Sequence, residues 1–170
     1  TTVAGATKPT WTGKQCIGVG KNPYQVGVAD FNGDGRADLA TANGYTNTVS
    51  LLLNTTAAGA TTPTFAEQEL DVKGVYVYSV AVGDFNGDGK ADLLWYNAAT
   101  GQTSIWLMNG LTPTSQVPVL TDANWKVTAT ADFNGDGKAD LLWYNAATGQ
   151  TAIWLINGTT PIGHSFILTG

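Results

Sequence analysis

The chain has 170 residues and a formal net charge of −5, and 43% of its residues are hydrophobic, which is ordinary for a globular domain with a substantial core. No stretch of about 18 apolar residues occurs, so no membrane span is predicted. No run of basic residues occurs, which argues against nucleic-acid binding. The single cysteine, Cys16, excludes an internal disulfide.

The first expected element is a strand over 10–19. Asp30 lies 21 residues after Pro9, and Asp84 lies 21 residues after Pro63. The residues after Pro63 are expected to form the last strand of a repeat, so 10–19 corresponds to the last strand of a preceding repeat. On this strand Cys16 is expected to be a small buried apolar residue, with an intermolecular disulfide as the alternative.

Three copies of the string DFNGDGxADL follow, at 30–39, 84–93 and 132–141. Each copy has oxygen-bearing side chains at positions 1, 3, 5 and 9, glycine at position 6 and a basic residue at position 7, whose backbone carbonyl can be a ligand. Calcium prefers six to eight oxygen ligands and tolerates irregular geometry. The sequence therefore predicts about three Ca²⁺ ions, one per loop. The expected ligands are Asp30, Asn32, Asp34, Arg36 and Asp38; Asp84, Asn86, Asp88, Lys90 and Asp92; and Asp132, Asn134, Asp136, Lys138 and Asp140.

Two other interpretations of the loops are weaker. An EF-hand needs a bidentate glutamate at position 12, where this chain has Thr41, Trp95 or Trp143, and the residues that follow each loop have the pattern of a strand. The loops could also be acidic turns without a metal, since Asp-Gly and Asn-Gly favour turns. Three copies with four oxygens in register favour calcium.

The distribution of charge also favours calcium. Of the thirteen acidic residues, nine lie in the loops, and three bound Ca²⁺ would change the net charge from −5 to about +1. Extracellular modules bind calcium with dissociation constants of roughly 10⁻⁴ to 10⁻³ M. Loops with this modest charge are expected in that range, which points to a secreted or cell-surface protein.

The loops belong to a longer repeat. Residues 84–113 and 132–161 are identical at 27 of 30 positions, and the repeat over 20–72 is more divergent. The second repeat contains four short apolar stretches, at 77–85, 92–97, 102–109 and 115–121, separated by turn residues. Four strands in about 50 residues are the content of one propeller blade. The predicted fold is all-β: a single domain of three four-stranded antiparallel propeller blades, at about 20–72, 75–121 and 124–170, preceded by the extra strand 10–19.

The loop followed directly by a strand resembles the FG-GAP/VCBS repeat family, which includes integrin α-subunit propellers and some fungal and bacterial propeller lectins. The resemblance covers nearly the whole chain. It implies that each loop joins the first two strands of a blade and binds Ca²⁺. Integrin repeats continue into a Gly-Ala-Pro segment where this chain has LWYNAATGQ, which favours the bacterial and lectin-like branch.

Aromatic residues recur after the loops, and two roles are open for them. Core packing between blades is the default, because both faces of a propeller blade are buried. Alternatively, some rings and neighbouring amides line clefts between blades and stack on sugars, as the resemblance to lectins implies. The candidates are Trp95, Tyr96, Asn97 and Trp106 in the second repeat, and Trp143, Tyr144, Asn145 and Trp154 in the third.

No catalytic site is predicted. The only histidine, His164, has no repeat partner, and Glu67, Glu69 and Asp71 alternate along one strand as expected for its solvent face. The predicted function is a noncatalytic extracellular module that recognises carbohydrate or another cell-surface ligand. The alternative is a structural spacer or interaction segment of a larger secreted propeller protein.

Three blades are fewer than the four to eight that usually close a propeller. Three possibilities are open: the chain is part of a longer propeller, copies assemble into a ring, or the three blades close in an unusual way. If the chain acts alone, we expect a homo-oligomer, most simply a dimer that forms a six-blade ring.

Overall fold

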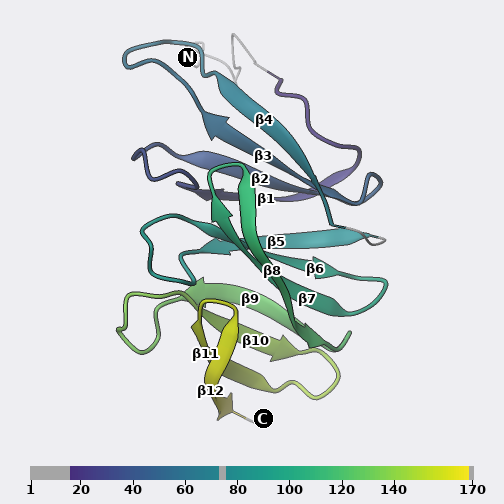
Figure 1. Cartoon of the computed structure of the whole chain (residues 1–170). Coiled ribbons are helices and arrows are strands. Elements are labelled where there is room, and N and C mark those ends of the chain that lie inside the picture. The colour runs from purple at the N-terminus through teal and green to yellow at the C-terminus, as the bar shows by residue number, and fades with distance from the viewer. Residues whose placement is uncertain (1–15, 73–75, 169–170) are drawn as a thin grey trace, which may run out of the picture.

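The computed structural model describes residues 16–72 and 76–168, and their only regular elements are twelve strands (Figure 1). The strands are β1 (Pro23–Ala29), β2 (Asp38–Asn43), β3 (Thr48–Asn54), β4 (Phe65–Asp71), β5 (Val77–Gly83), β6 (Asp92–Asn97), β7 (Gln102–Asn109), β8 (Thr112–Thr121), β9 (Trp125–Ala131), β10 (Asp140–Asn145), β11 (Thr151–Asn157) and β12 (Thr160–Leu168). This part of the chain contains no helix that could cross a membrane.

The strands form three four-stranded antiparallel sheets, each built from strands consecutive in the chain: β1–β4, β5–β8 and β9–β12. The predicted all-β architecture of three four-stranded repeats is confirmed, and we call the sheets blades 1, 2 and 3. In blade 2 the predicted boundaries differ at two points. Strand β5 ends at Gly83, before the loop, and β8 begins at Thr112, because a tight turn at Gly110 (φ 59°) joins it to β7.

The blades stack through two hydrophobic cores. Between blades 1 and 2, Leu51 and Ala40 pack against Leu93, Trp95 and Trp106 in the first core. The second core, between blades 2 and 3, contains Phe85, Leu94, Ile105, Leu141, Trp143 and Ile156. Both faces of blade 2 are therefore buried, which explains why β6 (DLLWYN) has an unbroken apolar pattern instead of an alternating one.

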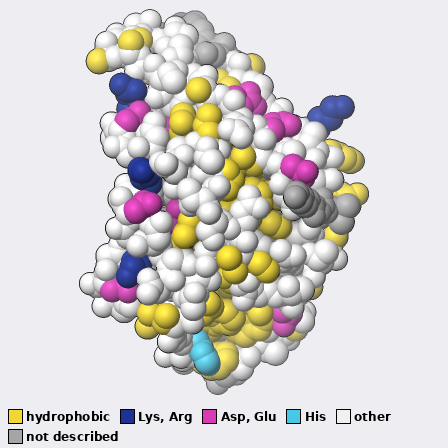
Figure 2. Space-filling view, in the orientation of Figure 1, with side chains coloured by type: hydrophobic (Ala, Val, Ile, Leu, Met, Phe, Trp, Pro, Cys, Tyr) yellow, Lys and Arg dark blue, Asp and Glu magenta, His cyan; other side chains and the backbone are white. Residues whose placement is uncertain are grey.

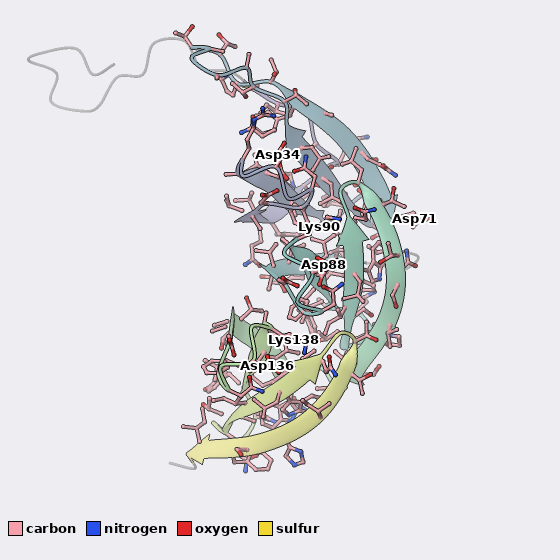
Figure 3. All side chains as sticks on the ribbon, turned by 60° about the vertical axis from the view of Figure 1, so that its left-hand side comes forward. Asp34, Asp71, Asp88, Lys90, Asp136 and Lys138 are labelled. Carbon is pink, nitrogen blue, oxygen red and sulfur yellow. The ribbon has the colours of Figure 1, made fainter. Side chains whose placement is uncertain are left out.

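The three blades form an open arc, with blades 1 and 3 at its two ends (Figures 1 and 3). Each end blade therefore has one face that no other blade covers. The difference is visible in equivalent residues: Tyr96 is buried in blade 2, whereas Tyr144 in blade 3 is 43% exposed. Closure of the three blades on themselves is not seen.

The described part of the predicted extra strand over 10–19 does not form a strand. Residues 10–15 of the expected extra strand lie outside the described residues, and residues 16–19 are not in a strand. Cys16 is exposed, so the prediction that it is buried was wrong. The spacing from Pro9 to Asp30 equals that from Pro63 to Asp84, which is the basis for the expected strand. A strand also needs a neighbouring strand to pair with, and residues 16–19 pair with none.

Most of the repeated aromatic residues serve the cores. Trp95 and Trp106 pack edge to face in the first core, with ring centroids 5.8 Å apart. Trp143 is fully buried in the second core, and the half-buried Trp154 packs against it with centroids 5.2 Å apart. Core packing is thus the main role of these rings, and it differs in degree between the two repeats.

We predict that Trp143→Ala lowers the free energy of unfolding by roughly 3–5 kcal/mol, because the change leaves a cavity in the second core. Trp154→Ala should cost less, since that side chain is only partly buried. Urea unfolding of the two variants beside the parent chain measures both. An equal loss, or a larger loss for Trp154→Ala, would contradict the assignment of Trp143 to the centre of this core.

Candidate functional site

The three acidic loops lie in one column along one edge of the arc, each joining the first two strands of its blade. Figure 3 shows Asp34, Asp88 and Asp136 in this column, with Lys90 and Lys138 between them. Figure 2 shows acidic and basic side chains alternating down the same edge. The stacking of equivalent blades thus brings three distant segments into one charged strip.

The first aspartate of each loop fixes the turn of the backbone. Asp30 accepts hydrogen bonds from the amides of Gly33 (2.7 Å) and Asp34 (3.2 Å) through Oδ1, and from Gly35 (2.7 Å) through Oδ2. Gly35 has φ 81°, a conformation that favours glycine and allows the chain to wrap around the carboxylate. Asp84 and Asp132 make the same bonds to their glycines.

The ninth loop aspartate has a different role, which sequence reasoning missed. Asp92 is fully buried; its Oδ2 accepts from the amide of Phe85 (2.9 Å), and its Oδ1 accepts from the amide of Met108 (2.8 Å) at the end of β7. Asp38 and Asp140 make the equivalent pairs of bonds. One carboxylate therefore joins the start of the loop, the start of the second strand and the end of the third.

The environments of these carboxylates shift their pKa values in opposite directions. Burial raises the pKa of Asp30, but hydrogen bonds from the amides of Gly35, Gly33, Asp34 and Asn32 outweigh it and lower the pKa. Burial, together with the charges of Asp88 and Asp84, outweighs the lowering effect of the two amide bonds and raises the pKa of Asp92 to about 6. The three acidic groups of the second loop thus lie close enough to repel one another.

The loops fit calcium in the type of their donors but not in their present arrangement. Each offers carboxylate oxygens, an amide oxygen and carbonyls, which are ligands that a hard cation prefers. In the described part of the chain, however, no three acidic, histidine or cysteine side chains converge on a metal-sized space. The carboxylates point at backbone amides instead, so calcium binding by the fifteen loop residues stays a prediction.

The loops also connect neighbouring blades through their backbone. The amide of Ala91 in the second loop donates to the carbonyl of Asp30 in the first (2.7 Å), and the amide of Gly110 donates to the carbonyl of Phe31 (2.9 Å). Blade 3 repeats both bonds toward blade 2, from Ala139 to Asp84 (2.7 Å) and from Gly158 to Phe85 (2.8 Å). Loop shape therefore controls how one blade seats on the next.

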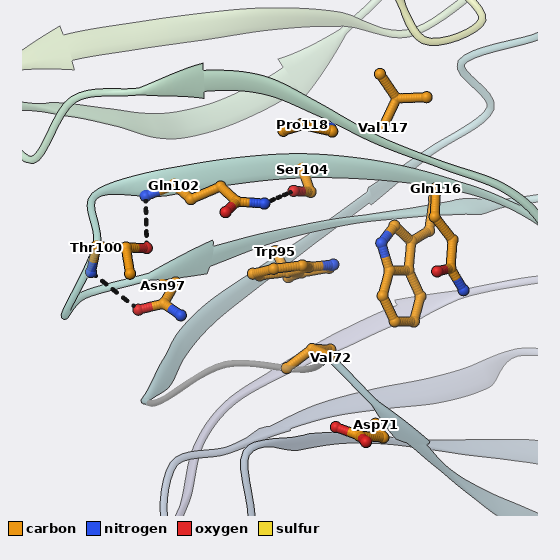
Figure 4. Close-up of a pocket in the computed structure, with 11 residues that line it drawn as sticks. Asp71, Val72, Trp95, Asn97, Thr100, Gln102, Ser104, Gln116, Val117 and Pro118 are labelled. Atoms are coloured by element: carbon orange, nitrogen blue, oxygen red, sulfur yellow. Dashed lines mark hydrogen bonds between the residues drawn. The ribbon is translucent and has the colours of Figure 1, made fainter.

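A cleft of about 250 Å³ lies between the end of β4 in blade 1 and strands β6–β8 of blade 2 (Figure 4). It brings together three of the predicted ligand residues, Trp95, Asn97 and Trp106. Gln102, an amide also expected to line a cleft between blades, is part of the wall. Sequence reasoning missed the other walls, which include Asp71, Val72, Ser104, Gln116 and Pro118. Asp71 is exposed on β4, as expected. Because β4 ends beside blade 2, Asp71 also lines the cleft.

Polar side chains in the cleft are held in position. Gln102 Nε2 donates to Ser104 Oγ (2.8 Å), and Asn97 Oδ1 accepts from the amide of Thr100 (3.1 Å), as the dashed lines in Figure 4 show. Trp95 lines the same cleft and is 3% exposed, yet its Nε1 has no hydrogen-bond partner. A buried indole N–H usually has a partner. The Nε1 of Trp143, the equivalent ring of blade 3, is also buried without a partner, although Trp143 does not line the cleft.

The remaining ligand candidates do not form a second site of this kind. Tyr96 is on the opposite face of β6, where its hydroxyl lies 3.4 Å from the carbonyl of Ala123. In blade 3, Trp154 lines a hollow of about 240 Å³ with His164 and residues 161–163, while Trp143 and Asn145 lie outside it. His164 is exposed beside Trp154, and Glu67 and Glu69 are exposed on β4.

We predict that Asp92→Ala destabilises the chain by roughly 2–5 kcal/mol even in excess chelator, because two buried amides lose their acceptor. Asp88→Ala in the same loop is the matched control; it removes an exposed carboxylate and should cost about 1 kcal/mol or less in chelator. Chemical unfolding in chelator measures both. Equal stabilities of the two variants would show that Asp92 does not act through the backbone.

A second prediction concerns the metal. If the loops bind calcium, the melting temperature should rise with millimolar Ca²⁺ and fall with chelator, since a ligand that binds only the folded state stabilises it. Asp88→Ala should empty the second site, so its melting temperature should respond less to Ca²⁺. Calorimetric melting with Ca²⁺ and with Mg²⁺ is the measurement, and an unchanged melting curve when metal-loaded protein receives excess chelator would rule the sites out.

The loop and its flanking strands match a known sequence family. The model of the FG-GAP-like repeat matches residues 30–95 and 84–143, two overlapping segments that together cover more than half of the 170 residues. No curated protein matches the chain. Repeats of this family suggest a propeller-like interaction module; they are typical of extracellular proteins and typically noncatalytic. On this match and on the three equivalent blades, the chain belongs to the FG-GAP-like repeat family.

Proposed function

We propose that the chain is a noncatalytic extracellular recognition module that binds carbohydrate, or another cell-surface ligand of similar chemistry, in the cleft between blades 1 and 2. The observation that carries this proposal is the lining of that cleft, which combines the indoles of Trp95 and Trp106 with the polar side chains of Gln102, Ser104 and Gln116. Calcium in the acidic loops would stabilise the fold and would have no direct part in recognition.

The chemistry of the cleft suits a sugar ring. A pyranose has an apolar face of C–H groups and a rim of hydroxyls that both donate and accept hydrogen bonds. The cleft offers indole surfaces from Trp95 and Trp106 together with the amide of Gln116 and the carboxylate of Asp71. Binding sites commonly combine aromatic walls with a few fixed polar groups in this way.

The position of the cleft also supports recognition over catalysis. Its walls come from two blades, so a stable orientation of the blades sets its shape. Among the described residues, Asp71 is the one acidic side chain that lines the cleft, and glycoside hydrolysis ordinarily uses a pair of carboxylates. We therefore assign binding without turnover to this site.

We predict that a glycan array will identify a sugar ligand, and that Trp95→Phe and Gln116→Ala each weaken its affinity about tenfold, equivalent to one lost hydrogen bond of about 1.4 kcal/mol. Trp95→Phe keeps an aromatic ring but removes the N–H donor. His164→Ala is the matched control, because His164 occupies in β12 the position that Gln116 has in β8, and it lies outside the cleft. Titration calorimetry with the identified sugar provides the affinities.

The outcomes separate the two functions considered for this chain. Loss of affinity in the cleft variants with an unchanged His164→Ala control supports recognition at this cleft. A folded chain that binds no glycan favours the alternative, a spacer or docking segment of a larger propeller. Affinity that is unaffected by both cleft variants would place the sugar site elsewhere.

A further inference from the structure

The two inner junctions of the arc follow one pattern, which predicts what can bind its two open ends. In both junctions a loop alanine amide donates to the first loop aspartate of the preceding blade, at 2.7 Å. In both, the phenylalanine at loop position 2 of the preceding blade, Phe31 or Phe85, is completely buried. The same elements are present at the ends of the arc but have no partner there among the described residues.

The open face of blade 3 has the residues of a buried junction. Phe133 is 41% exposed, although its equivalents Phe31 and Phe85 are buried. We call the blade-3 face the set Ala129, Phe133, Leu142, Tyr144, Ile153 and Leu155. These six match, residue type for residue type, the face with which blade 2 covers blade 3: Ala81, Phe85, Leu94, Tyr96, Ile105 and Leu107.

The open face of blade 1 matches the opposite side of a junction. Val26 and Val28 on β1 are each 56% exposed, whereas their equivalents in blade 2, Val80 and Val82, pack into the first core. We call the blade-1 face the set Val26, Val28, Ala37 and Leu39, which has the same residue types as Val80, Val82, Ala91 and Leu93. On the same side of blade 1, Thr41, Ser50 and Leu52 are already buried, and the amide of Gly20 donates to Ser50 Oγ there (3.2 Å). The exposed part of the blade-1 face, mainly Val26 and Val28, is therefore the part that can complement the blade-3 face.

We propose that copies of this chain associate head to tail, with the blade-3 face of one copy seated on the blade-1 face of the next. The amide of Ala37 would donate to the carbonyl of Asp132 of the second copy, as Ala91 donates to Asp30 within the chain. A head-to-tail contact closes only if the rotation per chain divides the circle. Two copies give a ring of six blades, within the four to eight blades of known propellers.

Close packing at this new junction is sterically possible. Gly83 lies so near Ala139 that an added Cβ would be 2.6 Å from the alanine Cβ, and blade 3 has Ala131 at the position of Gly83. The first junction shows that alanine is tolerated there. Its equivalent residue is Ala29, which packs against the same core as Ala91.

Two differences make the new junction weaker than the inner ones. Blade 1 has Thr41 where blade 2 has Trp95, so less aromatic surface is available on its outer strands. The amide of Thr56, equivalent to the donor Gly110, already donates to Asn54 Oδ1 within blade 1 (3.0 Å). We therefore expect a dimer that dissociates on dilution.

Sedimentation velocity over a range from nanomolar to high micromolar concentration tests the proposal. We expect about twice the chain mass of 17.7 kDa at the upper end and dissociation on dilution. Phe133→Lys and Val28→Lys should each shift the dissociation constant upward by at least tenfold. Ile162→Lys is the matched control: Ile162 is an apolar residue of blade 3 that is 55% exposed, but it lies beside Trp154 and outside the blade-3 face.

Disulfide trapping tests the head-to-tail arrangement. In a Cys16→Ser background, a mixture of Ala37→Cys and Ala131→Cys chains should form a cross-linked dimer on oxidation, and neither variant should do so alone. A chain that stays monomeric at all concentrations would overturn the proposal. A dimer that is insensitive to Phe133→Lys and Val28→Lys, or single-cysteine variants that cross-link with themselves, would also overturn it.

Discussion

A single buried carboxylate organises each blade, and the arc depends on it three times. Asp92 accepts one amide hydrogen bond from the residue after the loop's first aspartate and another from the end of the third strand, 16 residues further along the chain. It thereby fixes the loop against two strands at once. The carbonyls of Asp84 and Phe85 are then held where the next blade can donate to them, at 2.7 and 2.8 Å. Folding of a loop and seating of the next blade are thus parts of one interaction network.

Much of this fold could be predicted from the sequence, because the information is local and repeated. Strand content, loop positions and the number of blades follow from a period near 50 and from turn residues. The role of the ninth loop aspartate could not be predicted, since a carboxylate at that spacing suits a metal and a backbone acceptor equally well. Whether the carboxylate accepts from the backbone depends on whether the end of β7 lies close enough to the loop to donate to it, as Met108 does to Asp92. The same limit explains the cleft, because Asp71 joins the wall only when β4 reaches across to blade 2.

The near-identity of repeats has different consequences in the middle of the arc and at its ends. Leu94 and Tyr96 are buried between blades, while Leu142 is half-buried and Tyr144 is exposed at the end. The same sequence therefore forms core in one blade and an exposed face in another. Blade 1, the divergent repeat, has Thr41 and Leu52 in place of the paired tryptophans of the cleft wall. The proposed recognition cleft and the proposed assembly faces accordingly lie on different parts of the repeated surface.

The ninth loop aspartate holds each blade together through the backbone, whether or not metal is bound. Amide hydrogen exchange measured by NMR in excess chelator is the decisive test of this role. We expect the amides of Phe85 and Met108 to exchange as slowly as those in the centre of β6, through global unfolding. The exposed amides of Gly87 and Gly89, which donate to the partly buried Asp84, should exchange orders of magnitude faster. If the Phe85 and Met108 amides exchange as fast as those of the two glycines and become protected only when Ca²⁺ is added, the account is contradicted.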